Sequence, residues 1–128
     1  MADPIVVTSG SVAKYNTPVA VAAAAATSSV VDTAETFEVT YGTADGRVIL
    51  IANVANTHGS VTLTAPAGAF WAGGAQSIAC VQNKESVFVL EGAKGKLADG
   101  TIVITATPAS GKRLLTDHAF TLKAINLF

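Results

Sequence analysis

The 128 residues suffice for one domain with a buried core, and 50% of them are hydrophobic. Only 13% are charged and the formal net charge is -1, which argues against binding to nucleic acid or to an anionic membrane through charge. The single cysteine excludes an intrachain disulfide, and no signal peptide is evident, so we expect synthesis in the cytoplasm.

Residues 1–34 differ from the rest because their apolar side chains are mostly small and too few to bury a core. We expect them to form an extended N-terminal arm, either lying across a neighbouring molecule or adding an edge strand to their own sheet. The apolar and aromatic side chains of this arm are the candidate contacts with a partner. They are Ile5, Val6, Val7, Val12, Tyr15, Val19 and Val21.

The alanine-rich run at 20–26 has two interpretations. Alanine has the highest helix propensity, but a run this short, without caps or an apolar stripe, makes a marginal helix. Pro18 favours an extended residue before it. We therefore favour an extended segment at 18–22 followed by a loop, and the run is too short to span a bilayer.

From residue 36 onward, extended segments recur every eight to twelve residues. Each alternates apolar and polar residues or is continuously apolar, and turn signals such as Asp45-Gly46 separate them. The segments cover 36–41, 47–54, 60–65, 76–82, 85–90, 101–107 and 118–127. With the N-terminal region they give about eight strands and no amphipathic helix. This pattern predicts an all-β fold, an antiparallel β-sandwich of jelly-roll type over residues 35–128.

The stretch from Asp45 to Ala65 is the centre of this pattern. Its first strand, 47–54, contains a continuous aliphatic run at 48–52. Both faces of the strand are therefore apolar, and we expect both to be buried. The second strand, 60–65, has one apolar face (Val61, Leu63) and one hydroxyl face. A polar loop containing Gly59 separates the two strands and predicts a β-hairpin.

Residues able to carry chemistry are isolated from one another. His58 falls in a loop and His118 at the start of the last strand, where we expect an exposed residue and an ordinary strand-end residue. Asp45 and Asp99 each precede glycine, which is typical of turns. Cys80 lies among apolar residues and is expected to be buried and structural. The sequence therefore predicts no catalytic, metal-binding or cofactor-binding residue and no enzyme.

Phe70 and Trp71 form an aromatic pair in a Gly/Ala loop, where no periodicity requires burial. Trp71 either folds back over an open end of the sandwich or anchors an intersubunit contact, where tryptophan is enriched. Trp71 with Tyr41 or Phe70 could also form a stacking platform, which would suit a carbohydrate-binding module.

Several motifs between residues 36 and 126 recur together in one group of proteins. They are Asp45-Gly46-Arg47, the apolar strand 48–52 with Asn53, the strand 60–64, Pro66-Ala67-Gly68 and the segment 98–104. In these motifs the chain resembles the small all-β capsid decoration, or cement, proteins of tailed bacteriophages.

The resemblance implies a structural virion protein on the outer capsid surface. It implies contact with the major capsid protein through the N-terminal arm and loops, and self-association, with a homotrimer as the expected form. Neither nucleic acid nor membrane is an expected partner. A tail-tube, connector or fibre-associated phage domain has the same composition and is the alternative.

Overall fold

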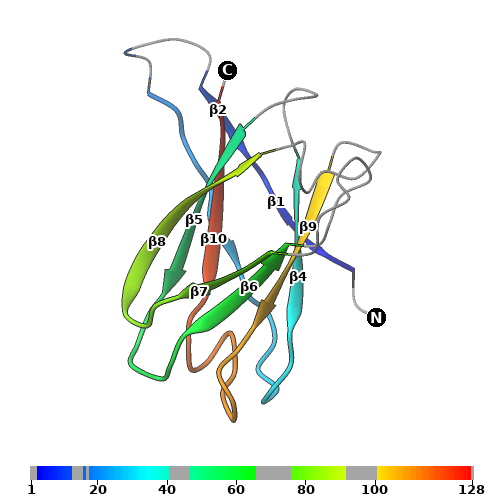
Figure 1. Ribbon diagram of the computed structural model, residues 1–128, viewed down its shortest axis with the longest axis vertical. Helices are drawn as coiled ribbons and strands as arrows, with labels where there is room; N and C mark the ends of the chain where they lie inside the picture. The colour runs from blue at the N-terminus through cyan, green and yellow to red at the C-terminus, as the bar shows by residue number, and fades with distance from the viewer. Residues whose placement is uncertain are drawn as a thin grey trace.

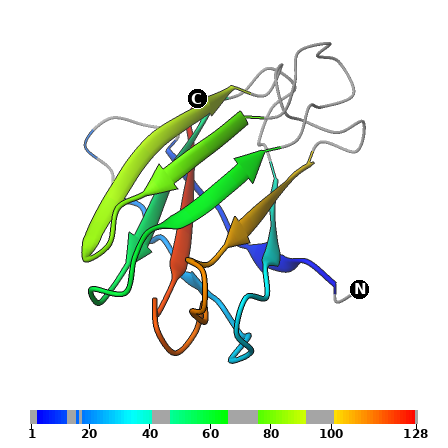
Figure 2. The same ribbon diagram turned by 60° about the horizontal axis from the view of Figure 1, so that its bottom comes forward.

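The computed structural model describes residues 3–12, 16, 18–40, 47–65, 76–91 and 101–127. The described chain is all-β, and its ten strands form two five-stranded sheets packed as a sandwich (Figures 1 and 2). These residues include no helix long and apolar enough to cross a membrane. The strands are β1 (Ile5–Val7), β2 (Gly10–Val12), β3 (Ala24–Ala25), β4 (Glu35–Thr40), β5 (Arg47–Val54), β6 (Val61–Ala65), β7 (Gln76–Cys80), β8 (Lys84–Glu91), β9 (Thr101–Thr107) and β10 (Thr121–Leu127).

The first sheet, sheet A, has the strand order β1-β4-β9-β6-β7. The second, sheet B, has the order β2-β10-β5-β8, with β3 also paired to β10. All neighbours are antiparallel except β1 with β4 and β2 with β10, which are parallel. The predicted all-β sandwich is confirmed, with ten strands where about eight were expected. The jelly-roll connectivity stays a prediction.

The predicted hairpin between 47–54 and 60–65 is wrong. Strand β5 pairs with β10 and β8 in sheet B, whereas β6 pairs with β7 and β9 in sheet A. The intervening residues carry the chain from one sheet to the other, with Asn56 and Gly59 at positive φ values of 66° and 105°. This crossing lets both strands direct an apolar face into the same core.

Residues 5–12 form edge strands of both sheets. β1 lies beside β4 with Ile5 opposite Phe37, and β2 lies beside β10 with Gly10 opposite Ile125. Two residues between them carry the chain across the edge of the sandwich. Of the two alternatives for this region, these residues take the edge strand of their own domain, and an arm on a neighbouring molecule stays a prediction.

The segment 18–26 contains no helix, so the helical interpretation of the alanine-rich run is wrong. Its strand is β3 at Ala24–Ala25, where a loop was expected after an extended segment at 18–22. Ala24 and Ala25 pair with Leu122 and Thr121 of β10. Upstream of them, the chain passes close over β2, where a Cβ atom added at Gly10 would lie 2.8 Å from Val19 Cγ1 and 3.1 Å from the Ala20 carbonyl oxygen. The small residues therefore permit close packing at this edge of sheet B.

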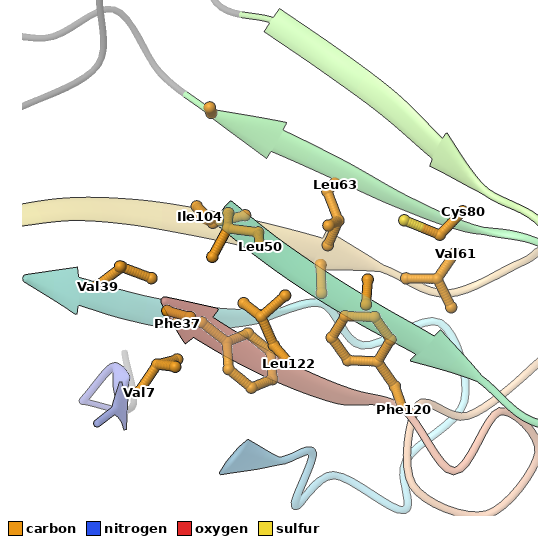
Figure 3. Packing of buried hydrophobic residues seen from close by; sticks show 14 of the residues in the cluster. Val7, Phe37, Val39, Leu50, Val61, Leu63, Cys80, Ile104, Phe120 and Leu122 are labelled. Atoms are coloured by element: carbon orange, nitrogen blue, oxygen red, sulfur yellow. The ribbon is translucent and has the colours of Figure 1, made fainter. Parts of the chain in front are cut away.

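The core lies between the two sheets and consists of aliphatic side chains around two phenylalanines (Figure 3). The rings of Phe37 and Phe120 meet edge to face, with centroids 5.5 Å apart and planes at 69°. Val7 from β1 is only 2% exposed and belongs to this cluster. Edge-to-face aromatic pairs add about 0.5–1.5 kcal/mol beyond the area they bury. The N-terminal strands thus contribute to the same core as the rest of the domain.

Candidate interaction surfaces

No arrangement for metal-dependent chemistry is visible in the described residues. No group of three or more His, Cys, Asp or Glu side chains within these ranges could hold a metal ion. His58 is exposed in its loop, as predicted. Cys80 is free and buried, as predicted, and burial raises the pKa of its thiol, partly offset by a side-chain hydrogen bond with Ser86. A buried thiol with a raised pKa is a weak nucleophile at neutral pH.

His118 differs from its prediction as an ordinary strand-end residue. It is fully buried, three residues before β10, and its Nε2 accepts a 3.2 Å hydrogen bond from the Ala109 N–H. Its Nδ1 has no hydrogen-bond partner among the described residues. Burial lowers the pKa of His118, with Asp117 opposing this and His58 and Lys112 adding to it. The side chain therefore fixes the loop between β9 and β10 as a neutral ring.

The outer face of sheet B is aliphatic at its centre. Across β8, β5 and β10, one row aligns Val89, Ile49 and Ile125, and the next aligns Val87, Ile51 and Lys123. A polar row follows, formed by Glu85, Asn53 and Thr121. Val87 and Val89 are 65% and 54% exposed, and the three isoleucines are half-buried. We call the five aliphatic side chains of the first two rows the aliphatic face.

The expected burial of 48–52 on both faces is therefore wrong within this chain. Val48, Leu50 and Ala52 are buried in the core, but Ile49 and Ile51 on the opposite side keep part of their surface accessible. Antiparallel sheets with one solvated face usually alternate apolar and polar residues, and β5 does not. The sequence of β5 is typical of a strand covered on both faces, but among the described residues its outer face is only half-buried.

The outer face of sheet A has the opposite character. One row across four strands consists of hydroxyl residues, with Thr36 opposite Thr105, Thr105 opposite Thr64, and Thr64 opposite Ser77. Thr64 and Ser77 are hydrogen-bonded to each other, with 3.3 Å between their side-chain oxygens. The predicted hydroxyl face of the strand at 60–65 is confirmed by this row. Hydroxyl side chains are suited to contact with water.

One end of the sandwich carries three exposed aliphatic side chains. Val30, Val31 and Leu115 are 62%, 41% and 42% exposed, in the β3–β4 and β9–β10 loops. These loops lie at the bottom of Figure 1 and are joined by the 3.1 Å hydrogen bond from the Leu115 N–H to the Ser28 carbonyl. We call these three residues the apolar tip.

The apolar tip is held by further hydrogen bonds between its two loops. The Asp32 N–H donates to the Lys112 carbonyl at 3.0 Å, and the Gly111 N–H donates to Asp32 Oδ1 at 2.7 Å. Within the β9–β10 loop, the Arg113 N–H donates to Asp117 Oδ2 at 2.7 Å. The tip is thus a connected structure that spans both loops.

A cavity of about 500 Å³ lies near this end, between residues 3–5 and the segment 27–36. Its wall includes Glu35, whose two carboxylate oxygens accept hydrogen bonds from the Thr27 N–H and hydroxyl group at 2.5–3.2 Å. These bonds fasten the start of the β3–β4 loop to the start of β4. The carboxylate therefore has a structural role in closing the loop.

The predicted contact residues are distributed over the domain and form no single surface. Val7 is buried in the core and cannot contact a partner in this fold, whereas its neighbour Val6 is 64% exposed. Ile5 packs partly against the core, and Val19 and Val21 lie over Gly10. Val12 is half-buried in β2. Tyr15, Phe70, Trp71 and Tyr41 lie outside the described residues.

The aliphatic face and the apolar tip were not selected from the sequence. A signal for the first was present, because the run Val48–Ala52 is aliphatic on both faces while Val87 and Val89 alternate beside it. The apolar tip had no such signal, because Val30 and Leu115 are 85 residues apart and only the fold brings their loops to the same end of the sandwich. Comparisons of this chain with family models, with curated proteins and with solved structures gave no match.

Proposed function

We propose that this chain is a structural virion protein that decorates and stabilises a bacteriophage capsid. The major capsid protein is its partner, and the chain itself performs no catalysis. The observation that carries the proposal is the apolar tip, which presents three exposed aliphatic side chains on hydrogen-bonded loops at one end of the sandwich.

The geometry of the tip suits docking to another protein. Exposed aliphatic side chains gain by burial, about 25 cal/mol per Å² of apolar surface removed from water. Loops already held by the Asp32 and Leu115 hydrogen bonds lose little conformational freedom on binding, so less of that gain is lost to ordering. A small rigid tip can therefore bind a preformed groove without refolding.

A capsid as the partner is supported by the sequence motifs shared with phage decoration proteins, centred on Asp45-Gly46-Arg47 and the segment 98–104. The small area of the tip also agrees with this setting. A shell repeats its binding sites many times, so a modest single contact can still give full occupancy if copies also touch one another. The N-terminal region takes part through Val30 and Val31, and the loops through Leu115.

The test is binding of the purified chain to phage particles that lack it, followed by sedimentation and by imaging of the particles. We expect saturable binding at hundreds of copies per particle. The variants Val30→Lys and Leu115→Lys should each weaken it at least tenfold, because a charge would be buried at the contact. Val81→Lys replaces a valine that is 49% exposed between β7 and β8, outside both the apolar tip and the aliphatic face, and is the control.

The control variant should bind the particles with the same affinity as the unaltered chain. Binding that survives both tip variants would remove the tip from the contact. A copy number of a few per particle would indicate a connector or tail component in place of a decoration protein, and no binding to any particle would overturn the proposal.

A further inference from the structure

The outer face of sheet B points to a second interaction that the proposed capsid contact does not use. We propose that it is a self-association surface, on which a second copy of this chain packs face to face about a twofold axis running along the strands. The inference rests on the aliphatic face and on the charges that flank it.

The first argument is the residue content of the centre of the face. Ile49 and Ile51 lie on β5, which has a neighbour on each side, so their exposure is not that of a frayed edge. Val87 and Val89 extend the same apolar surface onto β8 with more than half of each side chain accessible. Two sheets pack about 10 Å apart when their apolar faces interdigitate, and β-branched side chains are suited to this.

The second argument is charge complementarity, which selects a second copy and the direction of the axis. Glu85 lies on β8 and Lys123 on β10, at opposite flanks of the face and one row apart. A twofold axis along the strands places β8 of one copy over β10 of the other. Glu85 of each copy then lies within one row of Lys123 of its partner, and the two ion pairs border the aliphatic centre.

The other in-plane axis, perpendicular to the strands, gives a poorer match. It would place β8 over β8 and β10 over β10. Lys123 of one copy would then face the partner's β10, which carries the partner's Lys123, and no acid and base would be paired. A twofold contact of the favoured kind is isologous and closes on itself as a dimer. It differs from the homotrimer that the resemblance implies.

The size of the face sets the strength of the contact. Three strands about 4.8 Å apart, over seven residues at about 3.4 Å each, cover on the order of 350 Å² per copy. A standard stable interface buries about 800 Å² per partner. We therefore expect reversible, concentration-dependent pairing in free solution, with neighbouring copies on a shell held together more firmly by their high local concentration.

The primary test is sedimentation velocity of the full chain from about 10 µM to about 1 mM, a range that brackets weak association. We expect a monomer–dimer equilibrium. Val87→Lys should weaken the dimer at least tenfold, because it places a second positive charge against Lys123 of the partner. Val6→Lys, a valine of equal exposure on β1, should leave it unchanged.

The charge arrangement has a sharper test in the variants Glu85→Lys and Lys123→Glu. Each alone should abolish dimers, because the flanking pairs become like-charged. An equimolar mixture of the two variants should regain dimers, since each pair in a mixed dimer then joins one acid and one base. Circular dichroism and the thermal midpoint verify that every variant is folded.

A chain that stays monomeric throughout the concentration range overturns the proposal. So does a trimer, an equal effect of Val6→Lys and Val87→Lys, or a mixture that remains monomeric. Capsid binding that survives the tip variants, in a chain that still forms dimers, would overturn only the proposed function, so the two proposals fail separately.

Discussion

The two sheets share one core but present different chemistry on their outer faces. Sheet A presents a hydroxyl row of three threonines and one serine, and sheet B presents the aliphatic face of Ile49, Ile51, Ile125, Val87 and Val89. Both outer faces use β-branched residues, so strand propensity does not explain the difference. The hydroxyl face is suited to water, whereas the aliphatic face is the surface that we propose a second copy covers. The difference therefore lies in the residues chosen for the two outer faces and not in the strands that carry them.

The comparison would break if the outer side of sheet B were as deeply packed as its inner side. Leu50→Ala should lower the free energy of unfolding by about 2–5 kcal/mol, because it empties a fully buried site. Ile51→Ala on the other side of the same strand should cost about 1 kcal/mol or less. Urea denaturation of dilute protein measures both, and equal losses would mean that the aliphatic face is already covered.

The two edges of sheet B sharpen the comparison, because residues 19–21 lie over β2 whereas no described strand pairs with the far side of β8. Gly10→Ala on β2 should destabilise by about 1–3 kcal/mol, because the new Cβ meets Val19 Cγ1 at 2.8 Å and the Ala20 carbonyl oxygen at 3.1 Å. Ser11→Ala, exposed on the same strand, is the control and should change little. Thermal unfolding at fixed concentration would show this, and a neutral Gly10→Ala would mean that residues 19–21 do not close this edge.

The connection between the sheets is expected to respond to acid. The fold lowers the pKa of His118 below its ordinary value of 6.5, so the neutral ring is favoured in the native state. The resulting stability is complete above pH 6.5 and is lost as the pH falls below it. His118→Gln should remove this part of the pH dependence, and His58→Gln should leave most of it, because burial is the largest cause of the lowered pKa. Unfolding curves from pH 8 to pH 5 that are parallel for all three proteins would contradict the assignment.

The smallest effects are expected when a hydroxyl side chain on sheet A and an aliphatic side chain on sheet B are each replaced by the other type. Thr64→Val adds an aliphatic side chain to sheet A and should change the free energy of unfolding by no more than about 0.5 kcal/mol. Ile51→Thr makes the reverse change on sheet B. Binding of a hydrophobic dye should fall for Ile51→Thr and rise slightly for Thr64→Val. Dye binding that ignores both substitutions would show that the exposed aliphatic surface lies elsewhere.

The strands from residue 35 onward could be predicted because alternation and turn residues are local signals. Thr62 and Thr64 alternate with Val61 and Leu63, and the structure confirms both faces. Local signals do not show which strands pair with one another. The connection after β5 is long enough either to form a hairpin or to cross the sandwich, and only the packing of the whole core favours crossing.

The candidate surfaces illustrate the same limit of local signals. The aliphatic run 48–52 predicted burial of β5 on both faces, but Ile49 and Ile51 are only half-buried within the chain. A sequence does not distinguish burial by its own chain from burial by a partner. Similarly, His118 is buried because the loops around Gly59 and Ala109 come together, and these are 50 residues apart. The short strands β1 and β2 have three residues each, too few for a periodic pattern.

The parallel pairing of β2 with β10 has a consequence for how the protein is made. β2 precedes β3 to β9 in the chain, and the strand that pairs with it among the described residues is β10. During translation, β2 therefore has no β10 to pair with until residues 121–127 have been synthesised. Contacts between such distant segments form late and slow folding. In a nascent chain this edge is available to chaperones, or to the same segment of another copy, until the final strand arrives.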